Sequence, residues 1–178
     1  TALSNTRFRR YPGLSESFII DLGTSAVTFL ASRLQSPSDG SERDMLHRSG
    51  IIGRLVHLTS VPSNERSMVT RAISTFVEAN TPQSGNLSSG LSIALAEAMM
   101  ALGARGTDEE IPFLVEWATG RRTAKYERGL LGLFFVEEAA VHGLGFLGSP
   151  NSLAALERLR DDPEFSHAAV LAEAFANH

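Results

Sequence analysis

The stretch TGRRTAKYERG, residues 119–129, holds a dense group of side chains that could bind a charged partner. An Arg guanidinium is a planar fork of N–H donors that suits carboxylate or phosphate groups, and an aromatic ring adds a stacking surface. The alternative is a solvated loop, or a basic helix start paired with Glu116 and Glu127, because most charge clusters are solvated. We hypothesise a partner-binding site formed by Arg121, Arg122, Lys125, Tyr126 and Arg128.

A second pattern, GLGFLG at residues 143–148, has the G-x-G-x-x-G spacing of dinucleotide-binding loops. A dinucleotide-binding fold places this loop between a strand and a helix, and it continues with further strands and helices. Only 30 residues follow Gly148 in the sequence. We therefore expect no nucleotide site here and no cofactor.

Glu138 and His142 are four residues apart and would share one face of a helix, as two metal ligands would. The additional ligands that a metal ion needs are missing, so we expect no metal site. The acidic pairs at 109–110 and 161–162 stand at predicted helix starts, where the helix dipole favours negative charge. No G-x-S-x-G, H-E-x-x-H or phosphate-loop motif is present, so we expect no catalytic residues.

The composition is that of one soluble domain covering residues 1–178, with 43% hydrophobic residues and a net charge of −4. The longest apolar region, 130–148, is interrupted by Glu137, Glu138 and His142, so it predicts a buried helix and no membrane span. Cysteine is absent, which excludes disulfides and thiolate metal sites, and no signal-peptide pattern is seen, which favours the cytoplasm. A mildly acidic chain has no overall field that would attract nucleic acid, so we expect no nucleic-acid partner.

Hydrophobic residues recur with a period close to 3.6 along almost the whole chain, which predicts an all-α fold. Thr107 and Glu110 have the spacing of a capping box. Ser149 and Asp162 each precede a proline, as residues before a first helical turn often do. Residues 1–13 are polar and are expected to be poorly ordered. Helices are expected near 15–34, 43–59, 63–80, 89–104, 108–119, 127–146, 150–160 and 163–177.

The chain also repeats itself at a shift of 42 residues. The segment EAMMALGARGTDEEIPFLVEWA, from Glu97, aligns with AAVHGLGFLGSPNSLAALERLR, from Ala139, and both contain L-G-x-x-G-[ST]-x-x-x-[IL]-x-x-L. The last segment, PEFSHAAVLAEAFANH, matches again at a shift of 31. The difference between the shifts marks 119–129 as an insertion between repeats, and such insertions lie on loops of one face, often the binding face.

This alternation of a helix ending in A-x-x-x-L-G, a glycine turn opening with Thr or Ser, and a second helix with I-P-x-L or L-x-x-L resembles HEAT-like repeats. The resemblance is to the short bacterial kind that is also found in phycobilin lyases, and it is clear over about 90–178 and faint before. It implies a right-handed α-solenoid of antiparallel helix pairs, in which each pair buries its apolar face against its neighbours.

The repeat also suggests roles for the glycines and for two large side chains. Gly145 would end a helix in a left-handed conformation, Gly148 would lie in the same turn, and Gly143 would let two helices approach closely. Trp117 and Leu159 occupy the same repeat position and are assigned to the core.

Together these patterns predict a scaffold without catalysis of its own that binds a partner protein along one face. A HEAT-like DNA glycosylase of the alkylation-repair type and a chromophore-lyase component are the two alternatives, and both rest on family analogy. The C-terminal helix carries Val170, Leu171 and Phe175 on one side. If no helix of the same chain covers these residues, they would form a homodimer or partner surface.

Overall fold

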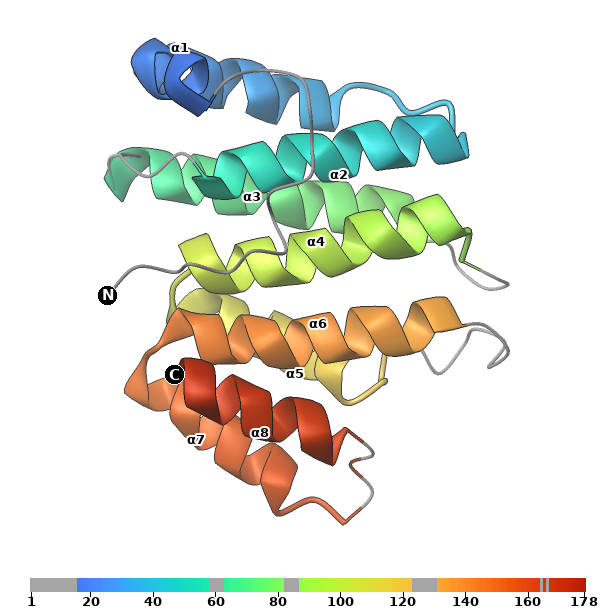
Figure 1. Cartoon of the computed structure of the whole chain (residues 1–178), viewed down its shortest axis with the longest axis vertical. Coiled ribbons are helices and arrows are strands. Elements are labelled where there is room, and N and C mark those ends of the chain that lie inside the picture. Colours follow the sequence, from blue (N-terminus) through green and yellow to red (C-terminus); the bar gives the residue numbers. More distant parts are fainter. Residues whose placement is uncertain (1–15, 58–62, 82–86, 123–130, 164, 166) are drawn as a thin grey trace.

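We describe the chain from a computed structural model, which defines residues 16–57, 63–81, 87–122, 131–163, 165 and 167–178 (Figure 1). Within these residues all regular structure is helical and no strand occurs, which confirms the predicted all-α class. The predicted disorder of 1–13 lies outside the described residues. The elements are α1 (Glu16–Gln35), α2 (Glu42–His57), α3 (Ser63–Asn80), α4 (Ser89–Arg105), the 3-10 turn η2 (Asp108–Glu110), α5 (Ile111–Ala118), α6 (Leu131–Leu147), α7 (Pro150–Arg160) and α8 (Ala168–Asn177).

The helices pack in an alternating order along the long axis of the molecule (Figure 1). One row consists of α2, α4, α6 and α8, in which each helix packs on the next. Within the other set, α1 packs on α3 and α5 packs on α7, and each of α1, α3, α5 and α7 also contacts the helix that follows it in sequence. Among the described helices, the most extensive contacts therefore join neighbours in this order.

The core follows the boundary between the two sets of helices. Its largest fully buried side chains include Phe76 of α3, Leu102 of α4 and Trp117 of α5. Trp117 and Leu159 are 0% and 4% exposed, which confirms their assignment to the core. No described helix has both the length and the apolar character that crossing a membrane requires.

Two of the predicted caps are present. The backbone N–H of Thr107 donates to the Glu110 carboxylate at 2.5 Å, and the Thr107 hydroxyl accepts from the backbone N–H of Glu109 at 3.3 Å. The range predicted as one helix, 108–119, therefore consists of the 3-10 turn η2 followed by the helix α5. Ser149 caps α7 by accepting from the backbone N–H of Ser152 at 3.1 Å. These side chains satisfy N–H groups that have no partner in a first turn.

The third predicted cap, Asp162 before Pro163, is wrong, because α8 begins only at Ala168. The backbone N–H of Phe165 donates to the Asp162 carbonyl at 3.1 Å and closes a turn instead. The buried His167 then lies with its Nε2 3.0 Å from a carboxylate oxygen of Glu137 in α6. His167 is thus joined to a helix distant in sequence immediately before α8 begins.

Glycines permit unusually close contacts within the α4, α6 and α8 row. A Cβ on Gly143 of α6 would lie 2.6 Å from the carbonyl oxygen of Met99 in α4, which confirms that Gly143 allows a close approach. A Cβ on Gly103 of α4 would overlap the backbone of Gly143. A Cβ on Gly145 of α6 would lie 2.6 Å from the carbonyl oxygen of Ala174 in α8. The contact of 103 with 143 therefore recurs as that of 145 with 174, as the sequence shifts of 42 and 31 require.

The predicted role of Gly145 as a helix terminus is wrong. Gly145 lies inside α6, which continues to Leu147. The left-handed residue is Gly148, with a φ of 62°, where the chain leaves α6 and enters the Ser149 cap. A residue without a Cβ adopts this conformation at little cost, so Gly148 closes the turn and Gly145 serves helix packing.

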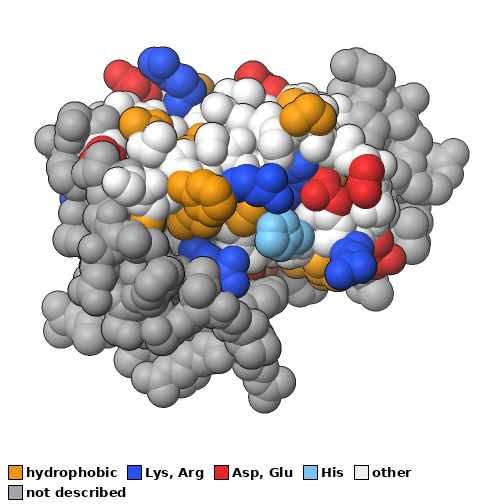
Figure 2. Space-filling view, turned by 90° about the horizontal axis from the view of Figure 1, so that it is seen from above, with side chains coloured by type: hydrophobic (Ala, Val, Ile, Leu, Met, Phe, Trp, Pro, Cys, Tyr) orange, Lys and Arg blue, Asp and Glu red, His pale blue; other side chains and the backbone are white. Residues whose placement is uncertain are grey.

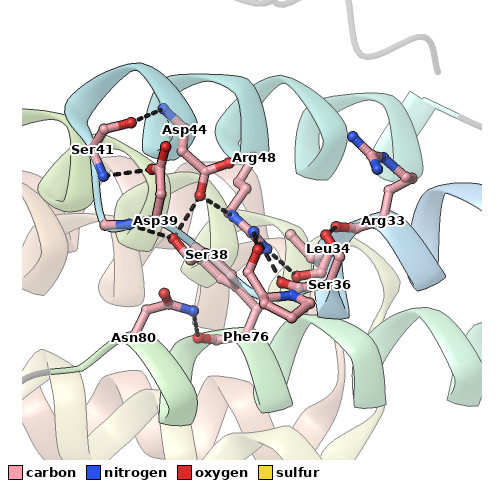
Figure 3. A network of polar contacts seen from close by, with 12 residues as sticks. Arg33, Leu34, Ser36, Ser38, Asp39, Ser41, Asp44, Arg48, Phe76 and Asn80 are labelled. Atoms are coloured by element: carbon pink, nitrogen blue, oxygen red, sulfur yellow. Dashed lines mark hydrogen bonds and ion pairs between the residues drawn. The ribbon is translucent and has the colours of Figure 1, made fainter.

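A polar network joins the end of α1 to the start of α2 (Figure 3). Its centre is Arg48, which is 3% exposed and whose Nε lies 2.7 Å from the Asp44 carboxylate. The Arg48 guanidinium also donates to the carbonyl oxygens of Leu34, Ser36 and Pro37 at 2.6, 3.0 and 3.1 Å. Arg48 thus satisfies the Leu34 carbonyl, which the last turn of α1 leaves without a helical partner, and two carbonyls of the segment that follows α1. We call Arg48, Asp44 and these carbonyls the α1–α2 clasp.

Candidate functional site

The structure describes two of the five predicted partner-binding residues. Arg121 and Arg122 follow the end of α5, in the turn after Ala118. Lys125, Tyr126 and Arg128 lie outside the described residues, so their part in the hypothesis stays a prediction.

Arg122 is held by contacts within its own part of the chain. Its Nε lies 2.7 Å from a carboxylate oxygen of Glu116, and its guanidinium carbon lies 4.9 Å from the centre of the Phe113 ring. This is the pairing with Glu116 that the alternative interpretation of the cluster predicts. Arg122 is therefore occupied by an ion pair and by stacking on an aromatic ring, and both orient the turn after α5.

Arg121 is exposed and lines a groove of about 570 Å³ between α5 and α7. The groove has an apolar centre, formed mainly by residues from the facing sides of the two helices. These apolar residues are Ile111, Pro112, Val115, Ala154, Ala155 and Leu159. The polar lining residues are Asp108, Thr119, Arg121, Asn151, Arg158 and Asp162. An apolar concavity with a few charged groups at its edge is the usual form of a ligand or peptide site.

The two ends of this α5–α7 groove differ in charge. At one end Asp108 accepts hydrogen bonds from the Ser149 hydroxyl and from Asn151 Nδ2, the latter at 2.5 Å. The hydrogen bond from Ser149 and, to a smaller extent, the one from Asn151 lower the pKa of the Asp108 carboxyl below its ordinary value. These contacts also bring the starts of α5 and α7 together, so Arg121 and Arg158 line the part of the groove near the ends of the two helices.

Arg121 and Arg158 are available for a ligand. Among the residues that the structure describes, neither guanidinium has a hydrogen bond, an ion pair or a ring contact. Asp162, which also lines the groove, does have interactions of its own. The groove thus offers two uncompensated guanidinium groups beside an apolar surface, which suits a carboxylate carried on an apolar segment.

Arg158 and the groove itself are not apparent from the sequence. Arg158 stands in the last turn of α7, where a cation is expected to favour the helix dipole and so has a local explanation. The available signal was its spacing from Ala154, one turn earlier, because a small residue and an Arg on one helix face leave room beside the cation. Arg121 lines the same groove only because α5 packs against α7. The spacing of residues in the sequence does not show this packing.

Glu138 and His142, which the sequence offers as two possible metal ligands, each contact a different residue. Glu138 lies 3.7 Å from Nδ1 of His167, and His142 lies 3.7 Å from the carboxylate of Glu173 in α8. Glu137, the residue before Glu138, is half-buried against His167. No group of three possible metal ligands occurs among the described residues. These side chains join α6 to α8 and its preceding segment.

The apolar side of α8 is covered largely by the same chain. Leu171 is 4% exposed, Ala174 is fully buried, and Val170 and Phe175 are half-buried against the core. Because the same chain covers Leu171, this residue is not part of an open surface on which a homodimer could form.

Comparisons of the chain with protein-family models, with curated proteins and with solved structures found no match.

Proposed function

We propose that this protein is a non-catalytic binding module that holds an acidic segment of a partner protein in the α5–α7 groove. One observation carries the proposal. The guanidinium groups of Arg121 and Arg158 lie beside the apolar centre of one groove, and neither has an ion pair with another described residue. An interface of this kind gains affinity from apolar burial, and charge complementarity selects the partner.

We further propose that the framework is a short HEAT-like α-solenoid. Three observations support this: the sequence repeat, the alternating order of helix contacts, and the recurrence of one glycine contact at the repeat shifts. In a repeat protein each unit contacts mainly its neighbours, so the stack presents long surfaces that move little. The α5–α7 groove lies between helices that occupy equivalent places in successive repeats.

The experiment is affinity capture from a lysate of the source cell, with the wild-type chain and an Arg121→Glu/Arg158→Glu variant as baits. A matched control carries two charge reversals elsewhere, Arg66→Glu and Arg71→Glu, both on the exposed side of α3. All three baits are first shown to unfold at the same temperature. Captured proteins are identified by mass spectrometry and the binding is repeated with the purified partner.

We expect a partner that wild type and control retain and that the groove variant binds at least about tenfold more weakly, or about 1.4 kcal/mol. Its bound segment should contain Asp or Glu beside apolar residues. Equal retention by all three baits would contradict a site in this groove. Retention that depends instead on Lys125, Tyr126 or Arg128 would move the site to the inserted segment.

A further inference from the structure

The end of the molecule formed by α1 and α2 carries exposed apolar and cationic side chains together. Figure 2 looks at this end and shows hydrophobic side chains beside Lys and Arg side chains, with a histidine among them. Phe29 is 62% exposed and Leu46 is 43% exposed, and apolar residues that gather in one exposed patch often mark an interaction site. We define the α1–α2 face as Phe29, Arg33, Arg43, Leu46, His47 and Arg54.

Helix geometry places these residues on one continuous surface. In α2, residues 43, 47, 50 and 54 follow each other turn by turn, whereas Met45, Ile52 and Leu55 are buried on the opposite side. In α1, Phe29 and Arg33 are one turn apart. The other flank of α1, with Thr28 and Ser32, lines a cavity against α3, so Phe29 and Arg33 lie on the flank nearer to α2.

The cations of the α1–α2 face are unpaired. Among the described residues, Arg33, Arg43 and Arg54 have no hydrogen bond or ion pair through their guanidinium groups. Two of the nearby carboxylates are already engaged, whereas Glu42 stands exposed at the start of α2. Asp44 belongs to the α1–α2 clasp, and Asp39 accepts from the backbone N–H of Ser41 at 2.8 Å. Figure 3 shows Arg33 with its guanidinium turned away from that network. The face is therefore positive in a protein whose net charge is negative.

Two glycines lie in the middle of this surface. Gly50 and Gly53 are inside α2, where glycine weakens a helix, and a Cβ on either would meet no atom within 4 Å. The helical glycines at 90, 103, 143 and 145 each avoid a clash with another helix. Packing within the described chain thus explains those four and does not explain Gly50 and Gly53. On the α1–α2 face the two glycines leave a smooth strip along α2 where a partner's backbone can approach closely.

We propose that the α1–α2 face docks an acidic amphipathic helix of a partner protein. Phe29 and Leu46 pack against the apolar side of that helix, and Arg33, Arg43 and Arg54 pair with its carboxylates. Exposed aromatic and Arg side chains at the centre of one patch are typical of residues that dominate binding. This surface is separate from the α5–α7 groove, so the proposal does not depend on the proposed function.

The test begins with a phage-displayed library of helical peptides selected on the whole chain. Peptides that also bind a Phe29→Ala/Arg33→Glu variant are removed. We expect the remaining sequences to be amphipathic and rich in Asp and Glu. The best peptide is then labelled with fluorescein, and its affinity is measured by fluorescence anisotropy for wild type and for single variants.

We expect Phe29→Ala and Arg33→Glu each to weaken this peptide at least tenfold. Met68→Ala, which truncates another exposed apolar side chain on α3, is the matched control and should leave the affinity unchanged. Gly53→Ala should raise the melting temperature and yet weaken the peptide, because the new methyl group helps α2 and obstructs the approach. A loss of folding would lower both quantities and is thereby distinguished.

Three outcomes of the peptide experiment would overturn the proposal, and so would two results obtained without the peptide. Selection could yield no peptide, or peptides without acidic residues, or peptides whose affinity Phe29→Ala leaves unchanged. Co-sedimentation with phosphatidylserine vesicles that requires Phe29 and Arg33 would assign the face to a membrane surface instead. A concentration-dependent dimer that Phe29→Ala abolishes would assign it to a second copy of this chain. The Arg121→Glu/Arg158→Glu variant should bind the peptide as wild type does, which separates this result from the fate of the groove.

Discussion

At the scale of single residues, the arginines divide into those that hold the fold together and those that remain free. Arg48 satisfies carbonyls at the end of α1, and Arg105 donates to the Val56 carbonyl near the end of α2. Burial, together with the charge of Arg66, lowers the pKa of Arg105 below its ordinary value. Arg122 is tied to Glu116. The same residue type therefore serves as a helix cap in the interior and as a candidate ligand on the surface.

We expect Arg48→Met to lower the free energy of unfolding by about 3 kcal/mol, because it removes one partner of a mostly buried pair and leaves the buried Leu34 carbonyl without its donor. Urea unfolding followed by the fluorescence of Trp117, the one tryptophan in the chain, measures the change. Arg43→Met, on the exposed side of the same helix, is the control and should change stability by less than about 0.5 kcal/mol. Equal effects of the two would show that the clasp contributes nothing beyond helix propensity.

A second prediction concerns Glu97 on α4, whose burial raises the pKa of its carboxyl from 4.5 to about 7. The folded protein therefore holds this proton more tightly than the unfolded chain, so stability falls as the pH rises from about 4.5 to about 7. Glu97→Gln should remove this loss and stabilise the protein at pH 8 by up to about 3 kcal/mol. The gain should disappear near pH 4.5.

Unfolding of both proteins across this pH range is the measurement, with Glu157→Gln on the exposed side of α7 as the control. A gain of the same size at every pH would attribute the effect of Glu97→Gln to helix propensity and not to the buried charge.

At the scale of helices, glycines with different surroundings have opposite roles. Gly103 and Gly145 lie where two helix backbones meet, so an added Cβ has no room. Gly50 and Gly53 lie in α2 facing open space. Sequence alone does not separate these classes, because all four are glycines in helical patterns. The packing partner decides whether the missing side chain is a requirement of the fold.

We expect Gly103→Ala to destabilise the protein by about 2 to 4 kcal/mol, since it forces α4 and α6 apart along a packed interface. Gly50→Ala should instead stabilise by about 0.5 to 1 kcal/mol, through better helix propensity and a smaller loss of chain entropy. Thermal and urea unfolding of the two variants compare them directly. Changes of the same sign would contradict the assigned packing of α4 on α6.

At the scale of the whole molecule, the two proposed surfaces lie at opposite ends of the stack of helices (Figure 1). The α1–α2 face is formed by the first helices and the α5–α7 groove by later ones, with α3 and α4 between them. If the proposed HEAT-like framework and both proposed surfaces are correct, the helices between the surfaces would hold two partners apart. We therefore propose that the protein bridges two other proteins.

We expect the two surfaces to bind independently, because no described element contributes to both. The affinity of the acidic helix for the α1–α2 face, measured by anisotropy, should change by less than about twofold when the groove is saturated with its partner. Light scattering should detect a complex of one chain with both ligands. Mutual exclusion of the ligands would show that the two surfaces belong to one binding site.

The sequence by itself determined the helical class, most helix bounds, two of three caps and the core positions of Trp117 and Leu159, because these depend on local spacing and polarity. Only the tertiary structure shows the late start of α8, with His167 joined to α6 immediately before it. It also decided that Gly145 serves packing and Gly148 the turn. Tertiary packing also decided that Arg121 and Arg158 line one groove, because a groove between two helices exists only once the helices are packed.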